Sequence, residues 1–135
     1  METVEKQVIR GGQFLVKEAQ PQDIFTPEDF TDEQKMMRDS VKEFVDREIW
    51  PNKEEFEKKN YALTEEIMRK AGELGFLGVA VPEEYEGLGM DFVSTMLVCD
   101  YISGATGSVA TAFGAHTGIG TLPITLYGTE EQKKK

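Results

Sequence analysis

The chain has 135 residues, of which 39% are hydrophobic and 30% charged, a composition typical of a globular domain. Its 25 acidic and 15 basic side chains give a net charge of −10, which opposes binding to the phosphates of nucleic acids. One cysteine and one histidine exclude both an internal disulfide and a Cys/His zinc site.

Residues 1–30 show no helical periodicity. They contain the pair Gly11-Gly12, the short apolar run Phe14-Leu15-Val16 and two prolines, which predicts an extended N-terminal arm rather than a domain. Their acidic start lacks the basic region and apolar block of a signal peptide, and no apolar run reaches the ~20 residues of a membrane helix. We therefore expect a cytoplasmic protein without a membrane span.

The first predicted helix begins at Thr31, which forms a T-x-x-Q capping box with Gln34. Pro51 is expected to kink or end it, and the charged segment 52–60 to continue it as a solvated stretch anchored by Phe56. Apolar residues recur along it with the spacing of one helical face: Met37, Val41, Phe44, Val45 and Ile49.

A second helix is predicted from a cap at Thr64 to Gly75, which has the position of a left-handed C-terminal glycine. A short buried passage and a glycine-containing turn follow at 76–89. Asp91 is the predicted cap of a third helix whose apolar residues cover nearly its whole circumference. We therefore expect that helix to be central and buried.

The C-terminal elements are built largely from small residues. Ser108 is the predicted cap of a helix that ends at Gly120 and Pro123, before a short helix that stops at Gly128. A second capping box then starts at Thr129, but only three residues follow it. This start without a helix behind it indicates a piece of a longer chain, and the element pattern predicts an all-α fold.

Few side chains are candidates for chemistry. His116 could be a general base, but no Cys, second His or spaced carboxylate accompanies it, so a structural role is favoured. Cys99 is expected to be a small core residue. Asp100 could act as a base, although a place on a polar stripe with Ser103 is favoured. The residues alone therefore predict an acidic helical domain without a self-contained active site.

Several motifs in fixed order resemble one family. They are Ala71–Gly78 running into Val81–Asp91, and then Gly120–Ile124 followed by Tyr127–Lys134. Together they resemble the N-terminal helical domain of acyl-CoA dehydrogenases, from about Thr31 to the end of the chain. The first thirty residues are similar to what precedes this domain in the very-long-chain branch. The resemblance implies an orthogonal or up-down helical bundle over residues 31–135, with the middle β-domain and C-terminal helical domain absent.

The resemblance also implies an activity for the full-length protein. It implies an FAD enzyme that dehydrogenates fatty acyl-CoA across Cα–Cβ in β-oxidation, with a glutamate base and flavin N5 as hydride acceptor. That glutamate and most flavin contacts belong to the absent domains, so the resemblance implies no catalytic, cofactor-binding or metal-binding residue here, and an inactive fragment. It further implies an electron-transfer flavoprotein as acceptor and a homo-oligomer when full length.

In the family, the helix before the Gly-x-x-Pro break lines part of the acyl-chain cavity. Counting back from Gly120, the implied substrate-binding positions are Thr111, Ala112, Ala115 and Ile119. A spacing of three and four places 112, 115 and 119 on one helical face. Small residues there would leave depth for a long chain, or would merely allow tight helix packing.

One residue departs from the family pattern, because Glu86 stands where the family usually has glycine. A glutamate there is strained if the turn requires a positive φ. Two other functions stay open: an acyl-CoA oxidase or flavin monooxygenase on the same fold, and a stand-alone helical interaction domain without enzymatic activity.

Overall fold

The computed structural model describes residues 8–9 and 11–134. The chain divides into two compact units, Met1–Asp32 and Glu33–Lys135, each described here by itself. All regular structure in the described residues is helical, with no strand among them, which confirms the all-α prediction. Among the helices that these residues form, none combines the length and the hydropathy that crossing a bilayer requires.

The first unit contains three short 3₁₀ turns, Gly11–Leu15, Pro21–Asp23 and Pro27–Asp29. Two of them start at a proline and end at an aspartate that accepts a hydrogen bond from the capping backbone N–H, of Gln20 at 3.0 Å and of Thr26 at 2.8 Å. The arm expected for residues 1–30 therefore has local turns that its prolines and aspartates produce. The prediction of an extended arm also covers residues 1–7 and 10, which lie outside the described residues.

The first long helix is α1 (Asp32–Phe44), which begins one residue after Thr31, as predicted, and belongs to the second unit from Glu33 on. A π-helical stretch, Val45–Ile49, and a 3₁₀ turn, Trp50–Asn52, connect it directly to α2 (Lys53–Glu57). The predicted continuation beyond Pro51 is confirmed. It is anchored, as expected, by the buried side chain of Phe56.

Helix α3 (Tyr61–Glu73) begins three residues before the predicted cap. Asn60 is the actual cap, because its Oδ1 accepts a hydrogen bond from the N–H of Leu63 at 3.2 Å. The Thr64 hydroxyl instead donates to the Asn60 carbonyl, at 3.2 Å. At the other end, Gly75 takes the predicted left-handed conformation, with φ of 80°.

The loop from α3 to α4 contains two 3₁₀ turns, Phe76–Gly78 and Glu83–Tyr85. Backbone hydrogen bonds fold the loop onto itself: the N–H of Gly89 donates to Val81 O at 2.8 Å, and the N–H of Met90 donates to Val79 O at 2.9 Å. These hydrogen bonds hold the loop together beside the helices that follow it.

Helix α4 (Phe92–Ala105) is capped by Asp91, as predicted, whose Oδ1 accepts from the N–H of Ser94 at 2.8 Å. The expectation that α4 is buried all round is wrong, because Phe92 is 72% exposed and Met96 42% exposed. The neighbouring helices cover only one side of it. That side carries Ser94, Val98, Ile102 and Ala105.

The last long helix runs without a break from Gly107 to Tyr127, through α5 (Gly107–Gly114), a π-helical stretch (Ala115–Thr121) and α6 (Leu122–Tyr127). The predicted end at Gly120 and Pro123 is therefore wrong. Its cap is Thr106 rather than Ser108, since Thr106 Oγ1 accepts from the N–H of Val109 at 3.3 Å. The turn α7 (Glu130–Lys133) follows, with its predicted capping box formed.

Both π-helical stretches end two residues before a proline, one before Pro51 and the other before Pro123. A proline inside a helix lacks an N–H, and its ring clashes with the carbonyl four residues earlier. The i→i+5 hydrogen bonds of a π-helix widen the turn at that point. The same local solution thus keeps both helices continuous across a residue that usually breaks them.

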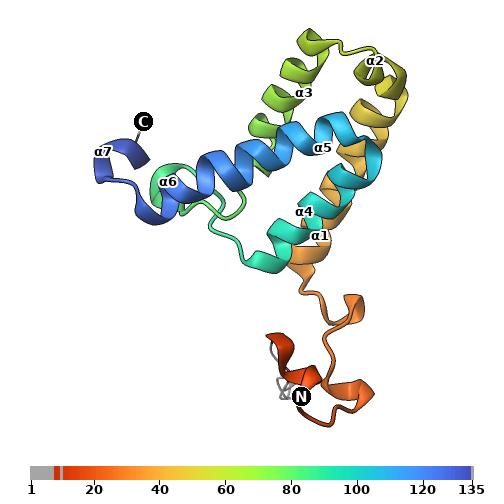
Figure 1. Ribbon diagram of the computed structural model, residues 1–135, viewed down its shortest axis with the longest axis vertical. Coiled ribbons are helices and arrows are strands. Elements are labelled where there is room, and N and C mark those ends of the chain that lie inside the picture. Colours follow the sequence, from red (N-terminus) through yellow and green to blue (C-terminus); the bar gives the residue numbers. More distant parts are fainter. Residues whose placement is uncertain (1–7, 10, 135) are drawn as a thin grey trace. The chain divides into compact units, whose positions relative to one another are not determined.

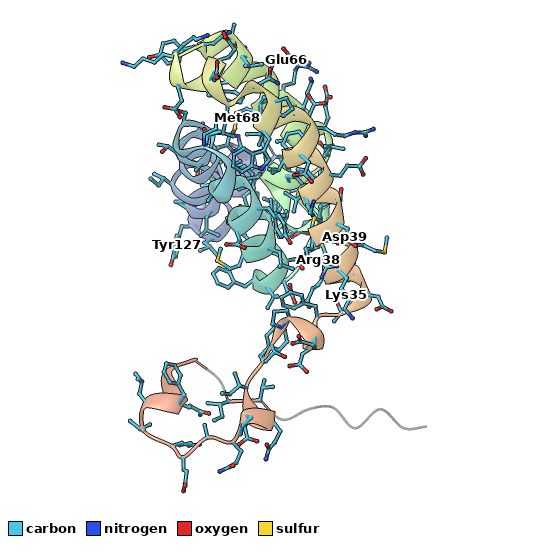
Figure 2. The ribbon with its side chains drawn as sticks, turned by 90° about the vertical axis from the view of Figure 1, so that its right-hand side faces the viewer. Lys35, Arg38, Asp39, Glu66, Met68 and Tyr127 are labelled. Carbon is cyan, nitrogen blue, oxygen red and sulfur yellow. The ribbon has the colours of Figure 1, made fainter. Side chains whose placement is uncertain are left out.

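One apolar core holds the second unit together. Helices α4 and α5 pack against each other, and α5 also contacts α2 and α3 (Figure 1). Phe44 and Phe76 meet edge to face, with ring centroids 5.5 Å apart. Charged side chains such as Lys35, Arg38 and Asp39 project from α1 (Figure 2). The core residues are Val41, Phe44, Val45, Ile49, Phe56, Ile67, Ala71, Phe76, Val79, Val98, Ile102, Ala105, Val109 and Phe113.

Candidate functional site

The candidate site is built on the helix from Gly107 to Tyr127, where every fourth residue is buried or half-buried. In a regular α-helix of 3.6 residues per turn, a spacing of four drifts by about 40° at each step. The wider i→i+5 turns of the π-helical stretch oppose that drift. One row of side chains, called the core row, therefore stays on the interior: Val109, Phe113, Thr117, Thr121 and Thr125.

Thr111, Ala115 and Ile119 form a second row on this helix, called the outer row. Each follows a core-row residue by two positions, about half a turn, and so lies on the opposite side. All three are exposed, Ile119 to 81%. The structure thus brings together three of the four expected substrate-binding residues.

Ala112, the fourth expected residue, is placed differently. It is half-buried and belongs to a row at the side of the helix with His116 and Gly120. The expectation that 112, 115 and 119 share a face assumed regular α-helical spacing. The π-helical stretch instead aligns Thr111 with Ala115 and Ile119.

The outer row is apolar in character. The Thr111 hydroxyl donates to the Gly107 carbonyl at 2.8 Å, so its hydrogen bond is made within its own helix. Ala115 presents a methyl group and Ile119 a branched aliphatic side chain. Because Ala115 is exposed, no helix of the described residues packs tightly against it, which disfavours the alternative that this row serves only close helix packing within this unit.

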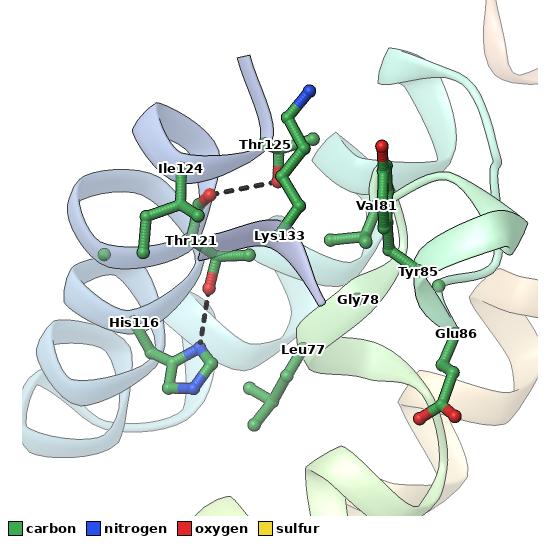
Figure 3. A pocket seen from close by; sticks show the side chains of 12 residues that line it. Leu77, Gly78, Val81, Tyr85, Glu86, His116, Thr121, Ile124, Thr125 and Lys133 are labelled. Carbon is green, nitrogen blue, oxygen red and sulfur yellow. Dashed lines mark hydrogen bonds between the residues drawn. The ribbon is translucent and has the colours of Figure 1, made fainter. Parts of the chain in front are cut away.

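A cavity of about 520 Å³ lies beside the helix, between the α3–α4 loop and α7. Figure 3 shows His116 and Thr121 on one side of it and Tyr85 on the other. The Tyr85 hydroxyl donates to Glu130 at 2.9 Å, and this bond raises the pKa of Tyr85 to about 12. Lys133 lies 5.5 Å from the centre of the Tyr85 ring. The lining thus combines the paired polar groups Tyr85 and Lys133 with apolar side chains such as Leu77 and Ile124, and it includes no outer-row residue.

His116 lines this cavity but has no carboxylate or thiol partner among its contacts in the described chain. Its Nδ1 lies 3.4 Å from the Thr121 hydroxyl. A general base usually requires a group that orients the imidazole and fixes its tautomer. The arrangement therefore gives His116 no acid–base relay.

A smaller cavity of about 190 Å³ lies between the same loop, α4 and the long helix. Its lining is mainly apolar and includes Phe92, Met96 and Cys99. Burial raises the pKa of the Cys99 thiol, so the reactive thiolate is disfavoured at neutral pH. Asp100 is exposed on the same helix, together with Ser103, in keeping with the expected polar stripe.

A polar contact that the sequence analysis missed joins the beginnings of α1 and α4. Gln34, only 6% exposed, donates from Nε2 to Asp91 Oδ2 at 2.7 Å. The two residues are 57 positions apart, and capping patterns report only local contacts. The link is structural and lies away from the outer row.

Two features bear on whether the described residues could hold a metal ion or a phosphate group. Within the described part of the chain, no group of three or more His, Cys, Asp or Glu side chains is arranged to hold a metal ion. The glycine-containing turn at 85–89 is packed rather than open, because a Cβ at Gly87 would lie 2.0 Å from the Val81 carbonyl oxygen. A phosphate cradle requires open backbone N–H groups at a helix start. This packed turn therefore provides no open cradle for a phosphate group.

Comparisons with known proteins agree with this organisation. Residues 31–135 match the family model for the acyl-CoA dehydrogenase N-terminal domain. A probable acyl-CoA dehydrogenase of Bacillus subtilis (strain 168) is 44% identical over 128 residues, which cover 95% of this chain and 21% of that protein.

Two solved structures are also similar. An acyl-CoA dehydrogenase from Bacillus anthracis, crystallised in complex with FAD, is 46% identical with a TM-score of 0.84, over 95% of this chain and 22% of that one. A chain in the structure of the electron transferring flavoprotein of Acidaminococcus fermentans is 32% identical with a TM-score of 0.70, over 81% and 28%. The chain thus spans 21% to 28% of the lengths of these three relatives.

Proposed function

The chain belongs to the acyl-CoA dehydrogenase family, whose N-terminal domain it contains, and we propose from this that it works within a full-length enzyme that dehydrogenates fatty acyl-CoA. FAD bound in that enzyme would supply the chemistry of accepting a hydride from Cβ, and a base outside this chain would remove the α-proton. The family match and the similarity to an FAD complex support this proposal. No acidic residue of this chain is assigned as the base.

The role of this chain is to form one wall of the pocket for the acyl tail. The observation that carries this role is the exposed, apolar outer row of Thr111, Ala115 and Ile119 on a continuous helix. Ala112 stands at the edge of that wall. Each methylene of the tail that is buried against such a surface contributes about 0.8 kcal/mol to binding. The wall thereby holds the thioester end in position while excluding water from the tail.

The electron acceptor and the assembly are further parts of the proposal. We assign reoxidation to an electron-transfer flavoprotein, and we expect the full-length enzyme to be a homo-oligomer. Similarity to a chain of an electron transferring flavoprotein structure supports a setting in flavin-based electron transfer. Gel filtration with light scattering and steady-state assays with purified acceptor flavoprotein test these two points.

The activity is tested on the purified full-length flavoprotein under anaerobic conditions. Adding acyl-CoA of increasing chain length is expected to bleach the oxidised flavin absorbance and to yield the 2-enoyl-CoA. Absence of bleaching with every chain length would overturn the proposed activity. Rapid reoxidation by oxygen, with stoichiometric hydrogen peroxide, would instead identify an acyl-CoA oxidase.

A further inference from the structure

The helix that carries the outer row changes its hydrogen-bond pattern just before Pro123 in the sequence. The N–H of Leu122 donates to the Thr117 carbonyl, an i→i+5 bond. In an α-helix the same N–H would donate to Gly118. Pro123 has no N–H, and its ring would clash with the Ile119 carbonyl in an α-helical turn. The π-helical stretch relieves that conflict while the helix continues to Tyr127.

Hydroxyl groups of the core row support both ends of the stretch. Thr117 Oγ1 donates to the Phe113 carbonyl at 2.9 Å, where the α-helical pattern gives way to the π-helical one. Thr125 Oγ1 donates to the Thr121 carbonyl at 3.0 Å, where the α-helix resumes. Such threonine bonds to the carbonyl four residues earlier favour local departures from regular helix geometry.

The π-helical stretch decides which side chains share the outer face. With α-helical turns throughout, two steps of four residues would rotate Ile119 by about 80° away from Thr111. The same change would turn Thr121 and Thr125 away from the core. The π-helical turns between Ala115 and Thr121 oppose that rotation, so Thr111, Ala115 and Ile119 are expected to stay near one line along the helix.

We propose that Pro123 is a positioning residue that sets the shape of the acyl-chain wall by enforcing the π-helical stretch from Ala115 to Thr121. This inference rests on the proposed function, in which the outer row contacts the acyl tail. Pro123 acts through the backbone of residues 115–121 and through the position of Ile119, not through contact with the reacting atoms.

The molecule offers a matched control for this inference. Pro51 follows the other π-helical stretch at the same two-residue distance, on a different helix. The N–H of Trp50 there donates to the Val45 carbonyl. Changing Pro51 alters the same kind of helix geometry without touching the outer row.

The test compares Pro123→Ala and Pro51→Ala in the full-length flavoprotein by crystallography, thermal unfolding and kcat/KM over a series of acyl-CoA chain lengths. We expect Pro123→Ala to transfer the Leu122 N–H bond from Thr117 to Gly118. We further expect it to change the ratio of long-chain to short-chain kcat/KM, by about fourfold for each methylene of pocket depth gained or lost. Pro51→Ala is expected to leave that ratio unchanged, whatever its effect on the melting temperature.

The possible results distinguish the role of Pro123 in the helix geometry from its effect on chain-length preference. A Pro123→Ala structure that retains the Thr117 bond would overturn the role of Pro123. Loss of that bond with an unchanged ratio, or an equal change of the ratio in Pro51→Ala, would overturn the link to chain-length preference while leaving the proposed activity intact. If the wild type acts on no acyl-CoA, the proposed function fails, and the link between Pro123 and chain-length preference fails with it. The crystallographic arm still decides whether Pro123 enforces the π-helical stretch.

Discussion

Glu86 has a backbone conformation better suited to glycine, with φ of 64° and ψ of 18°. A side chain in this left-handed region costs about 1–2 kcal/mol. We therefore predict that Glu86→Gly raises the free energy of unfolding of the 135-residue chain by about 1 kcal/mol, measured by urea denaturation. Glu84→Gly, two residues earlier and at negative φ, should lower it instead. Equal or reduced stability of Glu86→Gly would show that the turn is not strained.

Gly87 is required by close packing rather than by its φ angle. An added Cβ would lie 2.0 Å from the Val81 carbonyl oxygen and 2.4 Å from the Val81 carbonyl carbon, which are backbone atoms that cannot swing aside. Gly87→Ala is predicted to destabilise the chain by about 3 kcal/mol, measured by urea denaturation. Gly104 in α4 has open space around its Cα. Gly104→Ala should leave stability unchanged or raise it, so equal losses in both variants would contradict this reasoning.

The helix caps show how much a local sequence pattern can predict. Asp91 and Thr129 were predicted correctly because each directly precedes its helix. Thr64 and Ser108 were predicted wrongly, because Asn60 and Thr106 are also competent caps and stand earlier in the chain. Choosing between two acceptors depends on where the first turn packs, and this information is not local.

Asp91 links the start of α4 to α1, and the charge on its carboxylate makes this link between the two helices sensitive to pH. Burial acts to raise the pKa of Asp91, but hydrogen bonds donated by Ser94 and Gln34 outweigh it and lower the pKa below its usual value. The stability it contributes is therefore present above the unfolded-state pKa of about 4 and is lost as the pH falls through the lower folded-state value.

Asp91→Asn should keep a competent cap but lose this acid dependence. We predict that the wild type is more stable than Asp91→Asn at pH 7 and that the difference shrinks towards pH 2, in urea titrations at both pH values. Asp100→Asn, which alters an exposed carboxylate of the same helix, serves as the control. A difference independent of pH would show that the charge on Asp91 does not strengthen the contact.

For the long helices, the prediction was correct for α1 and wrong for the helix that contains Pro123. The start of α1 was predicted from a capping box and its apolar stripe from spacing, and the core confirms most of that stripe. The treatment of Pro123 as a helix end was wrong because breaker rules assume α-helical turns. The core row, whose residues are spaced by four, stays buried or half-buried only with π-helical turns. Nothing in the local sequence reports that these side chains pack against the rest of the unit.

The described residues 33–134 share one apolar core, and the family resemblance assigns most flavin contacts to other domains. We predict that the 135-residue chain, purified alone, is mostly helical by circular dichroism and does not retain FAD. Flavin absorbance at one equivalent per chain after gel filtration would contradict this. The full-length protein, expressed in parallel, provides the positive control for flavin incorporation.

The candidate site was predicted from a family resemblance rather than from residue chemistry. Two alanines of the long helix make it possible to test acyl-chain binding separately from helix packing. Ala115 is exposed and Ala112 half-buried on the same helix. Ala115→Phe should therefore leave the unfolding free energy of the 135-residue chain within about 0.5 kcal/mol of the wild type, whereas Ala112→Phe should cost about 1–3 kcal/mol.

In the full-length enzyme the Ala115→Phe side chain would fill the deep part of the proposed acyl pocket. Excluding four methylenes at about 0.8 kcal/mol each removes roughly 3 kcal/mol of binding, which lowers kcat/KM for long substrates about a hundredfold. Short substrates should keep most of their rate, because the reacting carbons are positioned elsewhere. The measurement is kcat/KM over an acyl-CoA series for both proteins, with melting temperatures alongside. A loss that is equal at all chain lengths would remove Ala115 from the acyl-chain wall.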